Sequence, residues 1–188
     1  MILNHKECLF LLVDVQEKLL KNIHANQFLK LNTQKILFFF NKLNLPIFIT
    51  EQYPAGLGKT SDEILNNNSF FSMNENINYS LFEKTTFSCF EDSNIKSRIK
   101  KANKKQILIC GIETHICVLQ TALDLINDGF SVFLVSDATG ARSKYSHDLG
   151  IQRMEINGAH ILNTEMVLFE LLRDSKHEHF KELSQLIR

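Results

Sequence analysis

The sequence predicts a three-layer α/β/α fold, with a mostly parallel open sheet of about six strands and helices on both faces. Short, continuous apolar runs rich in Leu, Ile, Val and Phe are typical of strands that are buried on both sides. Segments with helical spacing lie between these runs, and this alternation favours a parallel sheet. The 188 residues suit one compact core, so we expect a single domain over 1–188.

Polar or turn residues bound each expected strand. In chain order the strands are CLFLLVD (8–14), LPIFITE (45–51), YSLFEK (79–84), QILICGI (106–112), SVFLVSD (131–137) and HILN (160–163). The runs at 79–84 and 160–163 carry the weakest apolar signal.

Helical spacing predicts the connecting elements. They are expected at 26–43, 61–66, 92–103, 115–128, 145–157 and, in one or two pieces, 164–187. Thr114 would cap the helix at 115–128 and Gly129 would end it. NNSFFSMNENINYS (67–80) is expected to be a polar loop.

Charge and cysteine content limit the classes of partner. The 21 Lys and Arg residues balance 21 Asp and Glu residues, so no global field favours nucleic acid or an anionic membrane. The N-terminus lacks signal-peptide features, and no apolar stretch approaches the ~18 residues of a membrane span. Four cysteines without a CxxC pair suit reduced thiols. We therefore expect a cytoplasmic protein that acts on a small molecule.

Parallel sheets bind ligands beyond the carboxyl ends of their strands. The residues expected at that edge are Asp14, Glu51, Lys84, 112–117 and Asp137. Asp14 follows an apolar run, where it either caps the next turn or is a buried carboxylate that needs a partner. Lys84 is either an ordinary exposed lysine or a cation that stabilises Asp14 and a nearby thiolate.

Cys117 lies in "GIETHICVLQTALDLI" (111–126), in the first turn of an expected helix. The partial positive charge of a helix start favours the thiolate there, although a free cysteine is more often a small buried hydrophobe. Cys8 and Cys110 are expected in the core and Cys89 in a loop, without catalytic roles.

No cofactor or metal is expected. The sequence has no HExxH motif and no Cys/His finger spacing, and HEH (177–179) lies in a charged helical segment. AGLGKT (55–60) lacks the first glycine of a phosphate-binding loop, so we interpret it as a loop over the strand ends.

Five segments together resemble the isochorismatase-like family of cysteine hydrolases. These are LLVDVQEKL, ITEQYPAGLG, LFEKTTFSCF, CGIETHICVLQTALDL and VSDATGARS, which follow the order and spacing of the family. The resemblance implies an amidase-type catalytic triad of Asp14, Lys84 and Cys117. In such enzymes the aspartate accepts the thiol proton, the lysine supports the charges, and the cysteine attacks a carbonyl carbon to form a thioester.

The resemblance also implies the surroundings of the triad. The backbone amides of Glu113 and Cys117 would face the oxyanion, and the bond between Ile112 and Glu113 would be cis. The implied pocket residues are Gln16, Tyr53, Phe87 and His115. Alternatively, Tyr53, Phe87 and His115 are core or helix-start residues without contact to a substrate. Arg142 would meet an anionic substrate group or brace a loop or subunit contact.

The sequence departs from the motifs of two better-known enzymes of the family, and this narrows the subgroup that it resembles. Nicotinamidases of the family carry a metal-binding Asp-x-His where this chain has Glu51, Gln52 and Tyr53. True isochorismatases lack the cysteine that is present here as Cys117. The chain is thus similar to the metal-free isochorismatase domain-containing subgroup.

Two functions remain open. One is a cysteine hydrolase of a small amide or related acyl compound, and the other is a non-catalytic regulatory member of the same fold. Family members commonly form homo-oligomers, so we expect a dimer or larger assembly.

Overall fold

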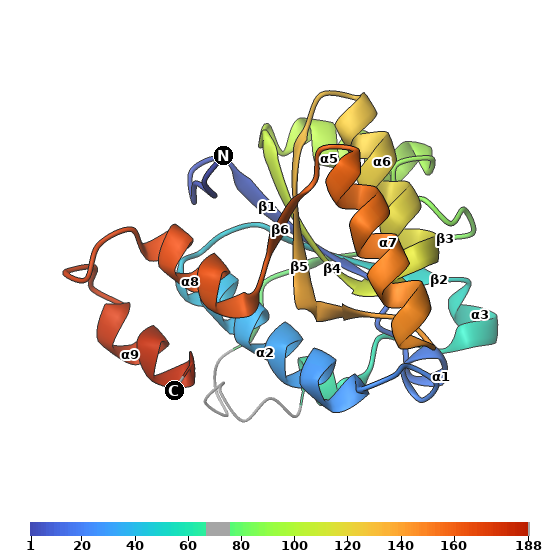
Figure 1. Cartoon of the computed structure of the whole chain (residues 1–188), viewed down its shortest axis with the longest axis horizontal. Helices are drawn as coiled ribbons and strands as arrows, with labels where there is room; N and C mark the ends of the chain where they lie inside the picture. The colour runs from blue at the N-terminus through green and yellow to red at the C-terminus, as the bar shows by residue number, and fades with distance from the viewer. Residues whose placement is uncertain (67–75, 188) are drawn as a thin grey trace.

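The computed structural model describes residues 1–66 and 76–187 and contains a six-stranded parallel sheet (Figure 1). The strands are β1 (Cys8–Val13), β2 (Ile47–Gln52), β3 (Ser80–Lys84), β4 (Gln106–Ile112), β5 (Ser131–Gly140) and β6 (His160–Leu162). Their order is β3-β2-β1-β4-β5-β6, and each neighbouring pair is parallel. The predicted fold class is confirmed.

Helices connect the strands. They are α1 (Glu17–Leu20), α2 (Asn26–Lys42), α3 (Pro54–Leu57), α4 (Asp62–Leu65), α5 (Ser93–Lys101), α6 (Leu119–Asn127), α7 (Lys144–Ile156), α8 (Thr164–Leu172) and α9 (Phe180–Ser184). A π-helical turn, Thr114–Val118, precedes α6, and a 3₁₀ turn, Gln185–Ile187, follows α9. No helix in the described ranges is long and apolar enough to cross a membrane.

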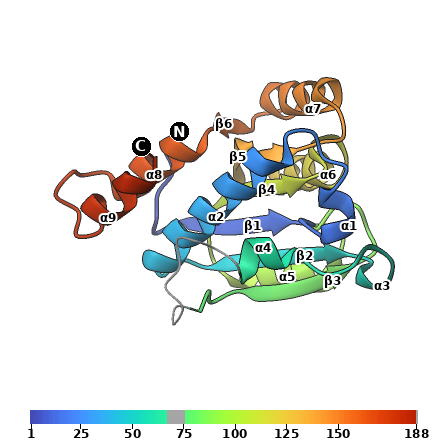
Figure 2. The ribbon, with the colours of Figure 1, turned by 90° about the horizontal axis from the view of Figure 1, so that it is seen from below.

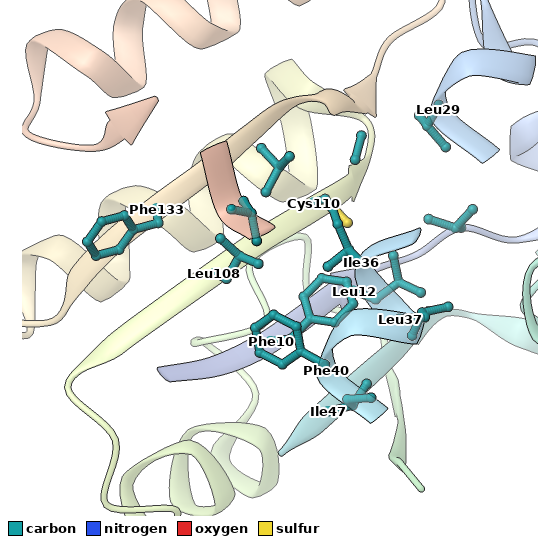
Figure 3. Close-up of a cluster of buried hydrophobic side chains, with 14 of the residues drawn as sticks. Phe10, Leu12, Leu29, Ile36, Leu37, Phe40, Ile47, Leu108, Cys110 and Phe133 are labelled. Carbon is teal, nitrogen blue, oxygen red and sulfur yellow. The ribbon is translucent and has the colours of Figure 1, made fainter. Parts of the chain in front are cut away.

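Alternate residues of β1 separate the two sides of the core. Phe10 and Leu12 pack with α2 and α8 on one face, and Figure 3 shows both beside Phe40 of α2. Leu9, Leu11 and Val13 pack with α5, α6 and α7 on the other face. Both faces of the strand are buried, which explains its uninterrupted apolar sequence.

The segment predicted as 131–137 is longer than expected. A register shift between Ile109 and Gly111 lets β5 continue beside β4 as far as Gly140. Asp137 therefore lies inside β5, where its carboxylate accepts hydrogen bonds from the amide and hydroxyl of Thr164 at the start of α8. Its predicted place at the strand end is wrong.

Short polar segments account for the other differences. The four-residue helices α1 and α3 were not expected, because they are too short to show helical periodicity. Most of the loop predicted at 67–80 lies outside the described residues, while 76–79 lead into β3 without helix or strand.

Gly111 permits an unusually close approach of β4 to β1. Its φ is 125°, and a Cβ atom there would lie 2.1 Å from the carbonyl oxygen of Val13. The contact is with backbone, so it could be relieved only by separating the two strands.

Gly111→Ala is therefore expected to lower the free energy of unfolding by at least ~3 kcal/mol. Gly129→Ala is the matched control, since Gly129 has φ 91° and no atom lies within 4 Å of the place that its Cβ atom would occupy. It should cost only ~1 kcal/mol of backbone strain. Urea unfolding measures both values, and equal losses would contradict the steric explanation.

Candidate active site

Three strand ends bring the predicted catalytic residues together. Asp14 follows β1, Lys84 ends β3, and Cys117 lies in the π-helical turn after β4. Figure 2 shows the strands β1 and β2 pointing toward the side where α1 and α3 lie. Asp14, Lys84 and Cys117 are all buried, with Cys117 retaining 7% exposure.

Asp14 and Lys84 form a buried ion pair. Lys84 Nζ donates to Asp14 Oδ2 at 2.7 Å, and neither side chain is exposed to solvent. Thr50 Oγ1 donates to the other carboxylate oxygen, also at 2.7 Å. Both oxygens of Asp14 are thus stabilised, and the interpretation of Asp14 as a helix cap is not supported.

The Lys84 ammonium has further acceptors. It donates to Gln52 Oε1 at 2.7 Å and to the carbonyl oxygens of Thr86 and Phe87, each at 3.1 Å. Burial lowers the pKa of Lys84, but the acidic groups of Cys89, Asp14 and Cys117 outweigh burial and raise it. Lys84 therefore remains a cation at neutral pH.

The Cys117 thiol keeps its proton in this environment. Burial raises its pKa to about 12, and the negative charge of Asp14 outweighs the opposing effect of Lys84. The predicted stabilisation of a resting thiolate by the helix start is thus wrong for the free protein, because burial and Asp14 both favour the thiol.

The loop before Cys117 contains the predicted backbone feature, since the bond between Ile112 and Glu113 is cis. The carbonyl oxygen of Glu113 accepts from the amides of Ile116 and Val118 at 3.0 and 3.3 Å. The helical segment starts one residue earlier than expected, as a π-helical turn with Glu113 as its N-cap. α6 ends before Gly129, as predicted.

Residues from the β5–α7 connection hold this loop in place. The Glu113 carboxylate accepts from the backbone amide of Arg142 at 3.0 Å and from Arg142 Nε at 3.1 Å. Thr114 Oγ1 lies 2.9 Å from His147 Nδ1, so Thr114 does not cap the helix as predicted. Of the two predicted roles for Arg142, these contacts favour the loop brace.

The predicted pocket residues divide into two groups. Tyr53 and Phe87 are 57% and 56% exposed, and His115 is partly buried, with its Nδ1 lacking a hydrogen-bond partner in the described part of the chain. Gln16 is fully buried instead. Its amide bonds the backbone of Gln52 and the carbonyl oxygen of Gly58, so its predicted contact with substrate is corrected to a supporting role.

Three supporting residues were missed at the sequence level. Gln52 links Lys84 to the carbonyl oxygen of Thr85, and its position at the end of β2 could have indicated it. Thr50 contacts Asp14 and also lies 3.6 Å from the buried Cys89 Sγ. Nothing in the sequence distinguishes Thr50 or Cys89 from ordinary core residues.

Glu51 does not take part in the site. Its carboxylate accepts from the amide and hydroxyl of Thr60 at 2.6 and 2.8 Å, which anchors the segment 55–60 over the strand ends. Within residues 1–66 and 76–187, no group of three or more His, Cys, Asp or Glu side chains is arranged to hold a metal ion.

Comparisons with known proteins agree with this architecture. A family model described as the isochorismatase domain matches residues 8–166. Isochorismatase family protein 1A of Dictyostelium discoideum is 35% identical over 180 residues, which cover 95% of this chain and 84% of the relative.

Two solved structures are also similar over the whole chain. The MAR1 ribonuclease of Caenorhabditis elegans is 30% identical, with a TM-score of 0.89 and 92% of its chain covered. The YcaC gene product of Escherichia coli, described as an octameric hydrolase of unknown specificity, is 26% identical, with a TM-score of 0.87 and 89% covered.

The ion pair predicts a specific effect of removing Lys84. Lys84→Met should lower the free energy of unfolding by about 3–5 kcal/mol, because it leaves the Asp14 charge buried without its cation. The double variant Asp14→Asn/Lys84→Met should recover part of this loss, since it buries no charge. Urea unfolding tests both, with Lys144→Met in the exposed pair with Asp148 as a control that changes little. A double variant as unstable as Lys84→Met would contradict the explanation.

The buried thiols predict loss of stability in alkali. The pKa of Cys117 is raised to about 12 and that of Cys89 to about 11, in both cases chiefly by burial. Because the folded protein holds these protons more tightly than the unfolded chain, the stabilisation is complete below the unfolded pKa of ~8.5. It is lost as pH rises toward the folded values, by up to ~1.4 kcal/mol per pH unit for each thiol.

Urea unfolding at about pH 8, 9 and 10 measures this slope. Burial raises the pKa of Cys8 and Cys110 as well, so Cys89→Ala removes one of four buried thiols and should make the slope shallower. A free energy of unfolding that stays constant from about pH 8 to 10 would show that the folded thiols have ordinary pKa values.

Proposed function

The chain belongs to the isochorismatase family, and from that premise we propose that it is a cysteine hydrolase. It cleaves a small amide or related acyl compound through a thioester on Cys117. The observation that carries this proposal is the buried ion pair of Asp14 and Lys84, whose charges both act on the Cys117 thiol.

Asp14 acts as the base for Cys117. Because the thiol holds its proton with a pKa of about 12, proton transfer to Asp14 accompanies attack of Sγ on the carbonyl carbon. Protonated Asp14 then gives this proton to the departing amine, and the acyl group stays on Sγ.

Lys84 supplies a fixed positive charge rather than a proton. Its three N–H groups face four acceptor oxygens at 2.7–3.1 Å, which keep the ammonium in place. When Asp14 accepts the proton, the charge of Lys84 is no longer compensated by Asp14 and stabilises the negative charge that develops on substrate. The backbone amides of Glu113 and Cys117 are the proposed oxyanion donors.

Hydrolysis of the thioester restores the site. Asp14 takes a proton from the attacking water, the hydroxide adds to the acyl carbon, and the proton returns to Sγ as the acid leaves. Tyr53, Phe87 and His115 are the proposed substrate contacts, since both aromatic rings are more than half exposed.

An assembly of several copies also fits the surface. Tyr145, Leu149 and Ile156 of α7 are 76%, 51% and 77% exposed, although they are large apolar side chains. Such a group of side chains favours a protein contact, and an octameric relative supports a homo-oligomer. The four free cysteines suit a reducing compartment, so we retain the cytoplasm as the proposed location.

Cys117→Ala should lower turnover of any amide substrate by at least about 1,000-fold, because no other atom replaces the nucleophile. Cys8→Ala, at the amino end of β1 and therefore at the opposite end of the strand from Asp14, is the matched thiol control and should retain activity. A panel of small amides identifies the substrate, and mass spectrometry of the quenched enzyme locates the acyl adduct.

Two results would contradict the proposal. One is undiminished amide turnover by Cys117→Ala. The other is cleavage of an RNA oligonucleotide by the wild type and by Cys117→Ala at equal rates, which would favour the activity named for the C. elegans relative.

A further inference from the structure

A cavity lies beside the loop that precedes Cys117, on the side away from β3. It has a volume of about 460 Å³, which is in the range of small-molecule sites. The first turn of α2, the end of β5 and the start of α7 line it, and these three segments meet at the lower side of the sheet in Figure 1. Asp14, Lys84 and Cys117 are not among its lining residues.

One wall of the cavity is apolar. Phe28, Leu29 and Ala25 line it from the start of α2, and Ala141 lines it from beyond β5. Phe28 is 71% exposed although Leu29, its neighbour, is 3% exposed and packs in the core. An aromatic ring at an open cavity offers a surface on which a ligand can pack.

Two histidine rings that line the cavity, His24 and His147, have ring nitrogens without a hydrogen bond to another described residue. His147 uses Nδ1 with Thr114, which leaves its second ring nitrogen, and the ring of His24 has no hydrogen bond to another described residue. Two other polar side chains of the lining already donate hydrogen bonds within the protein. Asn32 donates to the carbonyl oxygen of Asp137, and the Thr139 hydroxyl donates to the carbonyl oxygen of Val135.

The charged side chains around the cavity already have partners within the protein. Lys144 is paired with Asp148 at 2.6 Å, and Asp137 accepts two hydrogen bonds from Thr164. Burial lowers the pKa of His147. The negative charge of Asp148 raises this pKa, while Lys144 and His24 lower it. Burial thus favours the neutral His147 ring, and the Asp137 carboxylate is hydrogen-bonded to Thr164 within the protein.

The cavity shares its lining with the brace of the catalytic loop. His147 contacts Thr114, three residues before Cys117, and Ala141 is followed by Arg142, which holds Glu113. The helix α7 also lies close to this loop at Gly150, where a Cβ atom would be 3.1 Å from Thr114 Cγ2. A ligand in contact with His147 would therefore act on a residue that contacts the loop directly.

We propose that this cavity binds a small uncharged molecule with an apolar ring and a hydroxyl-type group, and that binding changes the reactivity of Cys117. The ring packs on Phe28 and Leu29, while the hydroxyl bonds an imidazole of His24 or His147. The binding step does not depend on the proposed hydrolase activity. Only the change at Cys117 rests on that function.

The binding test uses three probes of matched shape and different charge: benzyl alcohol, benzoate and benzylamine. Benzyl alcohol, which is not an amide and so is no substrate for the proposed reaction, should bind at least ~10-fold more tightly than either charged probe. Titrations followed by amide NMR signals give the dissociation constants and should shift the signals of residues 140–148.

Phe28→Ala and Phe169→Ala form a matched pair of variants. Both rings are exposed, at 71% and 44%, but Phe169 lies on α8 and does not line this cavity. Phe28→Ala should weaken benzyl alcohol binding about 10-fold, and Phe169→Ala should leave it unchanged. No saturable binding, equal affinity for the three probes, or equal affinity of the two variants would overturn the site.

The effect on the loop has two readouts. The rate at which acrylamide modifies Cys117 should change at least ~3-fold when benzyl alcohol saturates the wild type, and should not change with Phe28→Ala at the same concentration. The amide signals of Thr114 and His115 should shift in parallel. If Cys117 proves unreactive, these signals still test the coupling, so that result counts against the hydrolase alone. Saturable binding with no change in either readout would overturn the coupling.

Discussion

The buried ion pair between Asp14 and Lys84 is the interaction on which the rest of the site depends. Both side chains are fully removed from solvent, so each charge requires compensation at close range. Thr50 and Gln52, from the strand between them in the sheet, supply hydrogen bonds to the two charged groups. The pair thus requires β1, β2 and β3 to end at the same level, and the parallel register of these strands provides this.

The same pair determines the state of the thiol. Asp14 and Lys84 act on Cys117 in opposite directions, and Asp14 together with burial has the larger effect. The site therefore holds Cys117 as a thiol, which differs from a site that stores a free thiolate. In the proposed reaction, the buried lysine offers charge stabilisation only after the proton has moved, when the negative charge passes from Asp14 to the reacting atoms.

The fold was more accessible to sequence reasoning than the site. Six runs predicted six strands, and the signal was strongest for β1 and β4, because burial on both faces leaves a continuous apolar run. It was weaker for β3 and β6, which are partly exposed. The extension of β5 to Gly140 was missed, since it depends on a register shift opposite β4 that no local pattern records.

The resting state of Cys117 was predicted wrongly because the helix start is a local feature, whereas burial and Asp14 act through space. Gln16 was placed in the pocket from its position, but its side chain turns inward to Gln52.

The catalytic loop is constrained from two sides that are distant in sequence. On one side, the absence of a side chain at Gly111 lets β4 approach the backbone of Val13, next to Asp14. On the other side, Glu113 and Thr114 are held by Arg142 and His147. The first constraint sets how closely β4 lies against the strand that Asp14 follows, and the second sets the path of the backbone through the loop. Because the second constraint lies at the surface, beside a cavity, it is the one that a bound molecule can reach without entering the buried ion pair.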